Sequence, residues 1–105
     1  MKLLVAYEGE TMVAFAMYQY NLLKDDWFLT IDTGFIREIF VMEKYGETEI
    51  ARALIEKIEQ DLLKQEVYIT MVTANKRLSF FKQLGYQEIK GAHAANQEVV
   101  LIKQL

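Results

Sequence analysis

The sequence of 105 residues has no cysteine and a single histidine. The absence of cysteine excludes a disulfide framework, a thiolate metal site and a cysteine nucleophile, and it fits a reducing compartment. His93 lies in a stretch rich in glycine and alanine, with no other metal-binding side chain at ligand spacing, so we expect no metal site. Ser79 has no histidine at a suitable spacing, so no nucleophilic triad is predicted.

Long apolar runs and an excess of basic residues are also missing. The apolar stretch before Glu8 is too short for the core of a signal peptide, and no later run approaches the roughly 18 residues of a membrane span. We therefore expect a cytoplasmic protein without a membrane partner. The 12 lysines and arginines against 15 acidic residues argue against nucleic-acid binding, because that affinity rests on cations that neutralise phosphates. A small cationic substrate suits this charge better.

The composition is that of one packed domain. Hydrophobic residues make up 52% of the chain, and charged residues separate the apolar segments. A chain of this length buries enough surface to fold without disulfides or metals, so we expect a single domain over residues 1–105.

Apolar alternation predicts strands in the N-terminal part. Residues 3–7 and 12–20 are joined by turn residues 8–11, which indicates an antiparallel hairpin. The second strand is apolar on both faces, so we expect it near the middle of a sheet and covered on both sides. Residues 27–31 and 35–41 are also extended, either as one bent strand or as a tight pair.

Apolar residues that recur every four positions predict a long helix, and they are Ile50, Leu54, Ile58 and Leu62. We expect this helix to begin with Thr48 as its N-cap and to end near Lys64. Residues 67–72 then predict a buried strand. A strand–helix–strand connection of this length normally makes the two strands parallel neighbours.

The C-terminal part predicts a second helix and a closing hairpin. Thr73 or Asn75 is the expected N-cap, and Gly85 the C-terminal cap. Residues 86–89 and 98–105 are expected to pair across a loop over residues 91–97. The predicted order is therefore β-β-β-α-β-α-β-β, an α/β fold with a mixed sheet and helices packed on its faces.

Residues 36–59, IREIFVMEKYGETEIARALIEKIE, combine a strand, a polar turn and a helix. Such a turn leaves the first amides of the helix free at the positive end of its dipole, where an anion can bind. Residues 36–54 resemble the central motif of the GCN5-related N-acetyltransferases (GNAT), closest to the branch that acts on polyamines and small amines. Residues 75–86, NKRLSFFKQLGY, resemble the signature on a later helix of that family.

The resemblance implies an acyl-CoA-dependent N-acetyltransferase that uses acetyl-CoA and a small amine. It assigns Glu38 as the group that accepts the proton of the amine, whereas the alternative is a solvated strand residue paired with Arg37 or a lysine. It also implies cofactor contacts along one strand, around the diphosphate and on the later helix: Ile39, Phe40, Val41, Gly46, Glu47, Thr48, Glu49, Ile50, Ala51, Asn75 and Phe81. Asn75 is one position out of register, so a helix cap is its simplest role.

The sequence departs from the family pattern in the turn and on the later helix. Gly46 replaces the usual Gln or Arg, and Glu47 and Glu49 replace glycines. A carboxylate about 6 Å from the diphosphate costs about 3 kcal/mol at an effective dielectric constant of about 20, whereas an acidic first turn also satisfies the helix dipole. Phe81 replaces the tyrosine that protonates the thiolate, and phenylalanine has no proton to donate.

These departures leave open a catalytically inactive GNAT-like module that serves in regulation or protein interaction, or a subunit that acts only beside another protein. The first strand of the family and its next two helices have no counterpart before Leu3. Residues 3–7 are then expected to form an exposed sheet edge. We predict that a second copy covers this edge, so the expected state is a homodimer.

Overall fold

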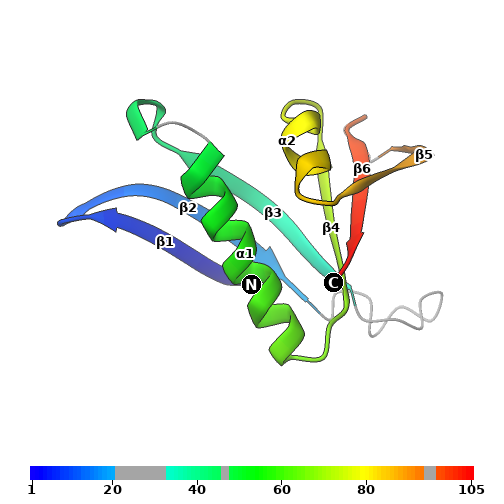
Figure 1. Ribbon diagram of the computed structural model, residues 1–105, viewed down its shortest axis with the longest axis horizontal. Coiled ribbons are helices and arrows are strands. Elements are labelled where there is room, and N and C mark those ends of the chain that lie inside the picture. Colours follow the sequence, from blue (N-terminus) through cyan, green and yellow to red (C-terminus); the bar gives the residue numbers. More distant parts are fainter. Residues whose placement is uncertain (21–32, 46–47, 94–96) are drawn as a thin grey trace.

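A computed structural model of the chain describes residues 1–20, 33–45, 48–93 and 97–105. The elements follow the predicted order (Figure 1). Their bounds are β1 (Lys2–Glu8), β2 (Thr11–Gln19), β3 (Gly34–Val41), a 3-10 turn η1 (Glu43–Tyr45), α1 (Thr48–Lys64), β4 (Ile69–Ala74), α2 (Leu78–Gln83), β5 (Gln87–His93) and β6 (Val99–Gln104).

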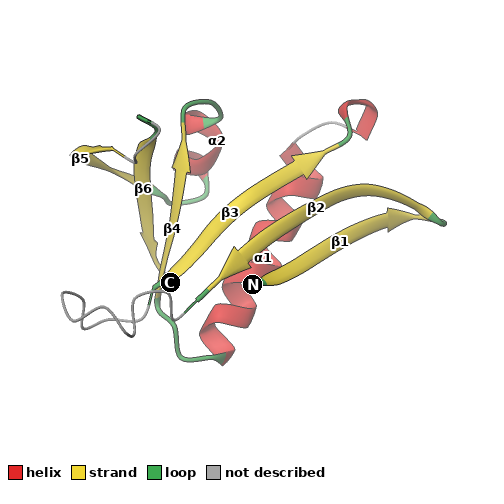
Figure 2. Cartoon of the chain, turned by 180° about the vertical axis from the view of Figure 1, so that it is seen from behind, coloured by secondary structure: helices red, strands yellow, loops and turns green. Residues whose placement is uncertain are grey.

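The described strands form one six-stranded mixed sheet in the order β1-β2-β3-β4-β6-β5. Among them, only β3 and β4 are parallel neighbours, as predicted for the strands that flank α1. Figure 1 shows α1 and α2 in front of the sheet and Figure 2, from behind, shows the face that carries neither helix. The sheet has two parts. We call β1, β2, β3 and α1 the first arm, and β4, β6, β5 and α2 the second arm.

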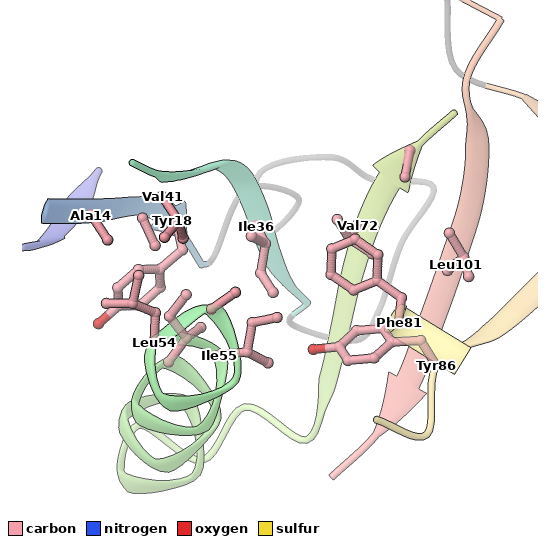
Figure 3. Close-up of a cluster of buried hydrophobic side chains, with 14 of the residues drawn as sticks. Ala14, Tyr18, Ile36, Val41, Leu54, Ile55, Val72, Phe81, Tyr86 and Leu101 are labelled. Atoms are coloured by element: carbon pink, nitrogen blue, oxygen red, sulfur yellow. The ribbon is translucent and has the colours of Figure 1, made fainter. Parts of the chain in front are cut away.

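The core lies between the helices and the sheet. Leu54, Ile58 and Leu62 of α1 are buried, which confirms the stripe predicted from their spacing. Figure 3 shows side chains of both arms converging on α1. The buried residues are Val13, Ala14, Ala16, Tyr18, Ile36, Val41, Ala51, Leu54, Ile55, Ile58, Leu62, Val67, Val72, Ala74, Phe81, Tyr86 and Leu101.

β2 was predicted to be covered on both faces, and in the described part of the chain this is wrong. Ala14, Ala16 and Tyr18 are buried on the side of α1. Phe15 and Met17 point to the opposite face and are only half-buried. β2 therefore lies next to the edge strand, and neither of the described helices covers its apolar second face (Figure 2).

β4 begins two residues later than predicted, because Val67 belongs to the end of α1. The amide of Val67 donates to the carbonyl of Leu62 at 2.8 Å, and that of Glu66 donates to Leu63 at 3.0 Å. Glu66 has φ 61°, so these bonds form a Schellman motif with a residue other than glycine in the left-handed position. Burial of Val67 therefore reflects helix termination rather than a strand.

Of the two predicted caps of α2, only the C-terminal one is confirmed. Gly85, with φ +97°, ends α2 as expected, since its amide donates to Lys82 and the next amide, of Tyr86, donates to Phe81. The N-terminal prediction is wrong. α2 begins at Leu78 after Arg77, which has φ 60° and makes no side-chain cap bond. Thr73 lies in β4, and Asn75 is exposed between β4 and α2, so neither residue caps the helix.

The closing hairpin is confirmed, because β5 and β6 pair antiparallel. β5 extends through Gly91 to His93, so the loop is shorter than predicted. The predicted strand over residues 27–31 lies outside the described residues. So does the predicted cap made by the Thr48 side chain, although α1 begins at Thr48 as its spacing indicates.

Candidate functional site

β3 and β4 diverge soon after they meet. They pair only over residues 34–36 of β3 and residues 70–72 of β4. Figure 1 shows the two strands spreading apart beyond this point. In the described part of the chain, the edge of β3 that faces β4 has no strand partner from Arg37 onward. Its backbone amides and carbonyls there are open to a ligand.

A cleft of about 270 Å³ opens where the strands diverge. β3 supplies one wall, and β4, the residues before α2 and the residue before β6 supply the other. The lining residues are Ile36, Arg37, Glu38, Ile39, Val72, Thr73, Ala74, Asn75, Lys76, Arg77, Phe81 and Glu98. The structure thus brings four predicted site residues into one cleft: Glu38, Ile39, Asn75 and Phe81.

A β-bulge at Arg37 directs Glu38 to the face without helices. Tyr18 pairs with Ile36 and Met17 pairs with Glu38, so Arg37 has no opposite residue in β2. Ile36 faces α1, and without the bulge Glu38 would do so too. The extra residue changes the alternation, so that Glu38 is exposed in the cleft.

Glu98 is a second carboxylate in the cleft, and the sequence did not predict it. Its Oε1 accepts a hydrogen bond from Thr73 Oγ1 at 3.2 Å. Thr73 alternates with the buried Val72 and Ala74, so both Thr73 and Glu98 lie on the same sheet face as Glu38. Only the non-local pairing of β4 with β6 brings Glu98 here, and no local pattern signals it.

Three cations also line the cleft: Arg37, Lys76 and Arg77. The cleft thus holds both signs of charge, with carboxylates on both walls. Arg77 has a left-handed backbone at the N-cap of α2, a conformation that costs a residue other than glycine about 1 kcal/mol or more. The sequence did not predict a role for Lys76 or Arg77.

Phe81 is buried and reaches the cleft from α2. Its ring packs edge-on against Phe80 and Tyr86, with centroid distances of 5.3 and 5.6 Å. The Tyr86 hydroxyl is directed to α1 (Figure 3), where it donates to Glu59 Oε2 at 2.9 Å. Burial, and then the charge of Glu59, raise the pKa of Tyr86. None of the described residues that line the cleft is a tyrosine, histidine or cysteine.

The other predicted cofactor residues of β3 lie beyond the cleft lining. Val41 is buried against α1, whereas Phe40 is 41% exposed on the opposite face. Phe40 stacks on Phe15 of β2, with ring centroids 5.5 Å apart. Their side chains therefore serve packing, and a cofactor would meet their backbone.

The described side chains at the start of α1 do not enter the cleft. Ala51 is buried, and Glu49 and Ile50 line a separate groove between β1 and α1. For these three residues, the predicted contacts with the diphosphate would come from backbone amides. Gly46 and Glu47, and the side chain of Thr48, lie outside the described residues.

Comparisons with known proteins agree with this arrangement. A family profile described as an acetyltransferase (GNAT) domain matches residues 1–88. No curated protein sequence matches the chain. The fold is similar to that of PaiA N-acetyltransferase from Thermoplasma acidophilum, crystallised with coenzyme A, with a TM-score of 0.76 and 12% identity over 98% of this chain and 60% of the other.

Two further solved structures have the same fold. A GNAT family acetyltransferase from Elizabethkingia anophelis, with acetyl-CoA bound, has a TM-score of 0.73 and 13% identity over 98% of this chain and 75% of the other. Aminoglycoside 6'-acetyltransferase type Ii has a TM-score of 0.77 and 14% identity over 97% and 67%. The TM-scores establish a shared fold.

The resemblance predicted from residues 36–54 and 75–86 is thus confirmed by a profile that covers most of the chain. No helix in the described ranges is long and apolar enough to cross a membrane. The solved structures share the overall fold of the chain, with TM-scores of 0.76 and 0.73. The chain belongs to the acetyltransferase (GNAT) domain family.

Proposed function

We propose that this chain is an N-acetyltransferase that transfers an acetyl group from acetyl-CoA to a small amine. The observation that carries this proposal is the cleft between β3 and β4, with an unpaired backbone edge along one wall. The related structures from Thermoplasma acidophilum and Elizabethkingia anophelis hold coenzyme A or acetyl-CoA, which supports acetyl-CoA as the cosubstrate.

The cofactor contacts we propose are mostly to the backbone. An extended pantetheine arm would pair with β3 beside Ile39, Phe40 and Val41 in the manner of an added strand. The diphosphate would lie at the N-terminus of the 17-residue helix α1. Glu49 is exposed and directed to the groove beside β1, so its carboxylate does not enter the cleft.

The acceptor we propose is an amine that is cationic before it reacts. Glu38 and Glu98 lie on the same sheet face and on opposite walls of the cleft, where they would attract such a substrate. The name of aminoglycoside 6'-acetyltransferase identifies one protein of this fold that acts on an amine-bearing molecule, which supports this class.

In the proposed reaction, Glu38 accepts a proton from the ammonium group, directly or through water. The freed amine nitrogen forms a bond to the thioester carbonyl carbon, and the bond from that carbon to sulfur breaks. The nitrogen loses its second proton to water, and the coenzyme leaves as a thiolate. Phe81 has no proton to give, so solvent protonates the thiolate.

A catalytically inactive module is the second candidate, because Phe81 replaces a proton donor and the first turn of α1 is acidic. A homodimer and a cytoplasmic location also remain our proposals. They are supported by the exposed edge at β1 and by the sequence features described above.

Calorimetric titration with acetyl-CoA separates the two candidates. We expect heat of binding and acetylation of a small diamine, and no binding at millimolar acetyl-CoA would retain only the inactive module. Glu38→Gln is expected to keep acetyl-CoA binding but to lower kcat by about 100-fold. The matched control is Glu43→Gln, an exposed residue of η1 outside the cleft.

A further inference from the structure

β1 is a free edge of the sheet with an unusually apolar surface. Within the described residues it pairs with β2 alone, and Leu3 and Tyr7 are 59% and 65% exposed. Edge strands are normally protected by a bulge, a proline or an inward-pointing charge. The bulge in this hairpin is in β2, at Val13, so β1 itself is regular and its charges lie only at its two ends.

The sequence of β1, KLLVAYE, is complementary to a second copy of itself that runs in the opposite direction. In an antiparallel pair centred on Val5, Lys2 lies opposite Glu8 of the second copy, and Leu3 lies opposite its Tyr7. Each end then brings Glu8 of one copy beside Lys2 of the other, which also lies 3.2 Å from Asp61 of its own chain, and the two exposed apolar residues cover each other. Opposite residues in an antiparallel pair share a face, so these contacts agree with the pleat.

α1 carries a second pattern with the same symmetry. A groove of about 400 Å³ separates β1 from α1 and is lined by Leu4, Val5, Ala6, Tyr7, Glu49, Ile50, Ala53, Leu54 and Lys57. Glu49, Ala53 and Lys57 are exposed at intervals of four residues, so they form one stripe along α1. The first residue of the stripe is acidic, the last is basic, and the middle one has a small side chain.

A single two-fold axis would place the residues of β1 and those of the α1 stripe opposite complementary residues of the second copy. An axis perpendicular to the sheet at Val5 places α1 antiparallel to its copy on the same side of the joined sheet. Glu49 then faces Lys57 of the second copy, and the small Ala53 lies at the centre, where the helices approach most closely. The middle residues that β1 contributes to the groove lie across it from the middle residues that α1 contributes.

We infer that two copies of this chain pair through β1, antiparallel and centred on Val5, to form one continuous sheet. This inference rests on the proposed homodimer and specifies its contact surface. The cleft lies beyond β3, two strands from the paired edge, so both clefts stay open. The mass of the particle reports the pairing whether or not the chain binds acetyl-CoA, so failure of one proposal leaves the other testable.

Sedimentation equilibrium of two charge-swap variants tests the pairing. Lys2→Glu places two carboxylates opposite each other at each end of the paired strands, and Glu8→Lys places two ammonium groups there. Each variant alone is therefore expected to raise the dimer Kd by about tenfold or more. An equimolar mixture restores opposite charges across the pair and is expected to return to within about threefold of the wild-type Kd. Glu43→Lys and Lys64→Glu are the charge-matched controls away from the edge.

Cysteine cross-linking tests the register, because the natural chain has no cysteine. Val5→Cys places two thiols directly opposite at a separation that a disulfide can span. Leu3→Cys is the matched control, since its two thiols lie about 13 Å apart along the strands. Rapid cross-linking of only the first variant supports the inference. A monomeric wild type at about 50 μM, an unchanged dimer in Glu8→Lys, or equal cross-linking of both cysteine variants would overturn it.

Discussion

The two arms of the sheet are held together in different ways. In the first arm, β2 pairs along most of its length with β1 and β3, and α1 covers one face with a continuous apolar stripe. In the second arm, α2 has six residues and a smaller apolar contact. The second arm is also tied to α1 by polar contacts to Glu59. The first arm is therefore expected to be the more stable unit.

The largest effect is expected from Ile58→Ala in α1, compared with Phe81→Ala in α2. Ile58 is fully buried, and its loss should lower the free energy of unfolding by about 3 kcal/mol. Phe81→Ala should cost a similar amount, but amide hydrogen exchange should rise mainly in β5 and β6. Equal loss of protection in both arms of both variants would show that the arms unfold as one unit.

Gly34→Ala is expected to act on the joint between the arms. A Cβ at Gly34 would lie 2.5 Å from Leu62 Cδ1, and Leu62 is fully buried. We expect a loss of about 2 kcal/mol in urea unfolding, because the core has little room to move. In the double variant with Leu62→Ala the two losses should be less than additive. Full additivity would mean that the two residues do not meet.

Glu59→Gln should loosen the contact between α1 and the second arm. Lys103 Nζ lies 3.0 Å from Glu59 Oε1, and the Tyr86 hydroxyl lies 2.9 Å from Oε2. Because Lys103 and Glu59 are partly buried and Tyr86 is buried, we expect a loss of about 1–2 kcal/mol. Lys82→Gln is the control, since its pair with Glu88 is about half exposed and should contribute little.

The raised pKa of Tyr86 makes the same contact sensitive to high pH. The native pKa lies above the unfolded value of about 10, so the contribution to stability is complete below pH 10 and is lost as pH rises further. Tyr86→Phe should remove this alkaline loss and lower stability at pH 7. A variant whose unfolding midpoint falls above pH 10 as steeply as that of the wild type would contradict the assignment.

The smallest effect is expected from Tyr18→Phe in the first arm. The Tyr18 hydroxyl donates to Asp61 Oδ2 at 2.6 Å, and this bond, together with Lys2, lowers the pKa of Asp61. A lowered pKa adds stability above the unfolded value of about 4 that is lost as pH falls. Tyr18→Phe should therefore cost about 1 kcal/mol at pH 7 and less at pH 3. A constant difference across this range would contradict the coupling.

The first arm was the more predictable of the two, because its period-2 strands and its four-residue stripe in α1 are long local patterns. In the second arm, the predicted starts of β4 and α2 were both too early in the sequence. At these boundaries Glu66 and Arg77 adopt left-handed backbones, which only glycine or asparagine would signal. Its element types and the end of α2 at Gly85 were still correct.

The candidate site was predictable only where a local motif marks it. Glu38, Ile39, Asn75 and Phe81 line the cleft as separate stretches of sequence, and the resemblance named all four. Glu98 was missed because its place depends on the pairing of β4 with β6, which no local pattern encodes. The direction of the Glu49 side chain was missed as well, since it depends on how α1 packs beside β1.

The bulge at Arg37 changes which residues of β3 point to α1. Before it, the even-numbered residues of β3 point to α1, and after it the odd-numbered ones do. Deletion of that one residue would leave a regular strand in which Glu38 follows Ile36 directly and every side chain keeps its side. A regular strand that retained Arg37 would instead turn the carboxylate of Glu38 toward the hydrocarbon interior, and Ile39 and Val41 toward water.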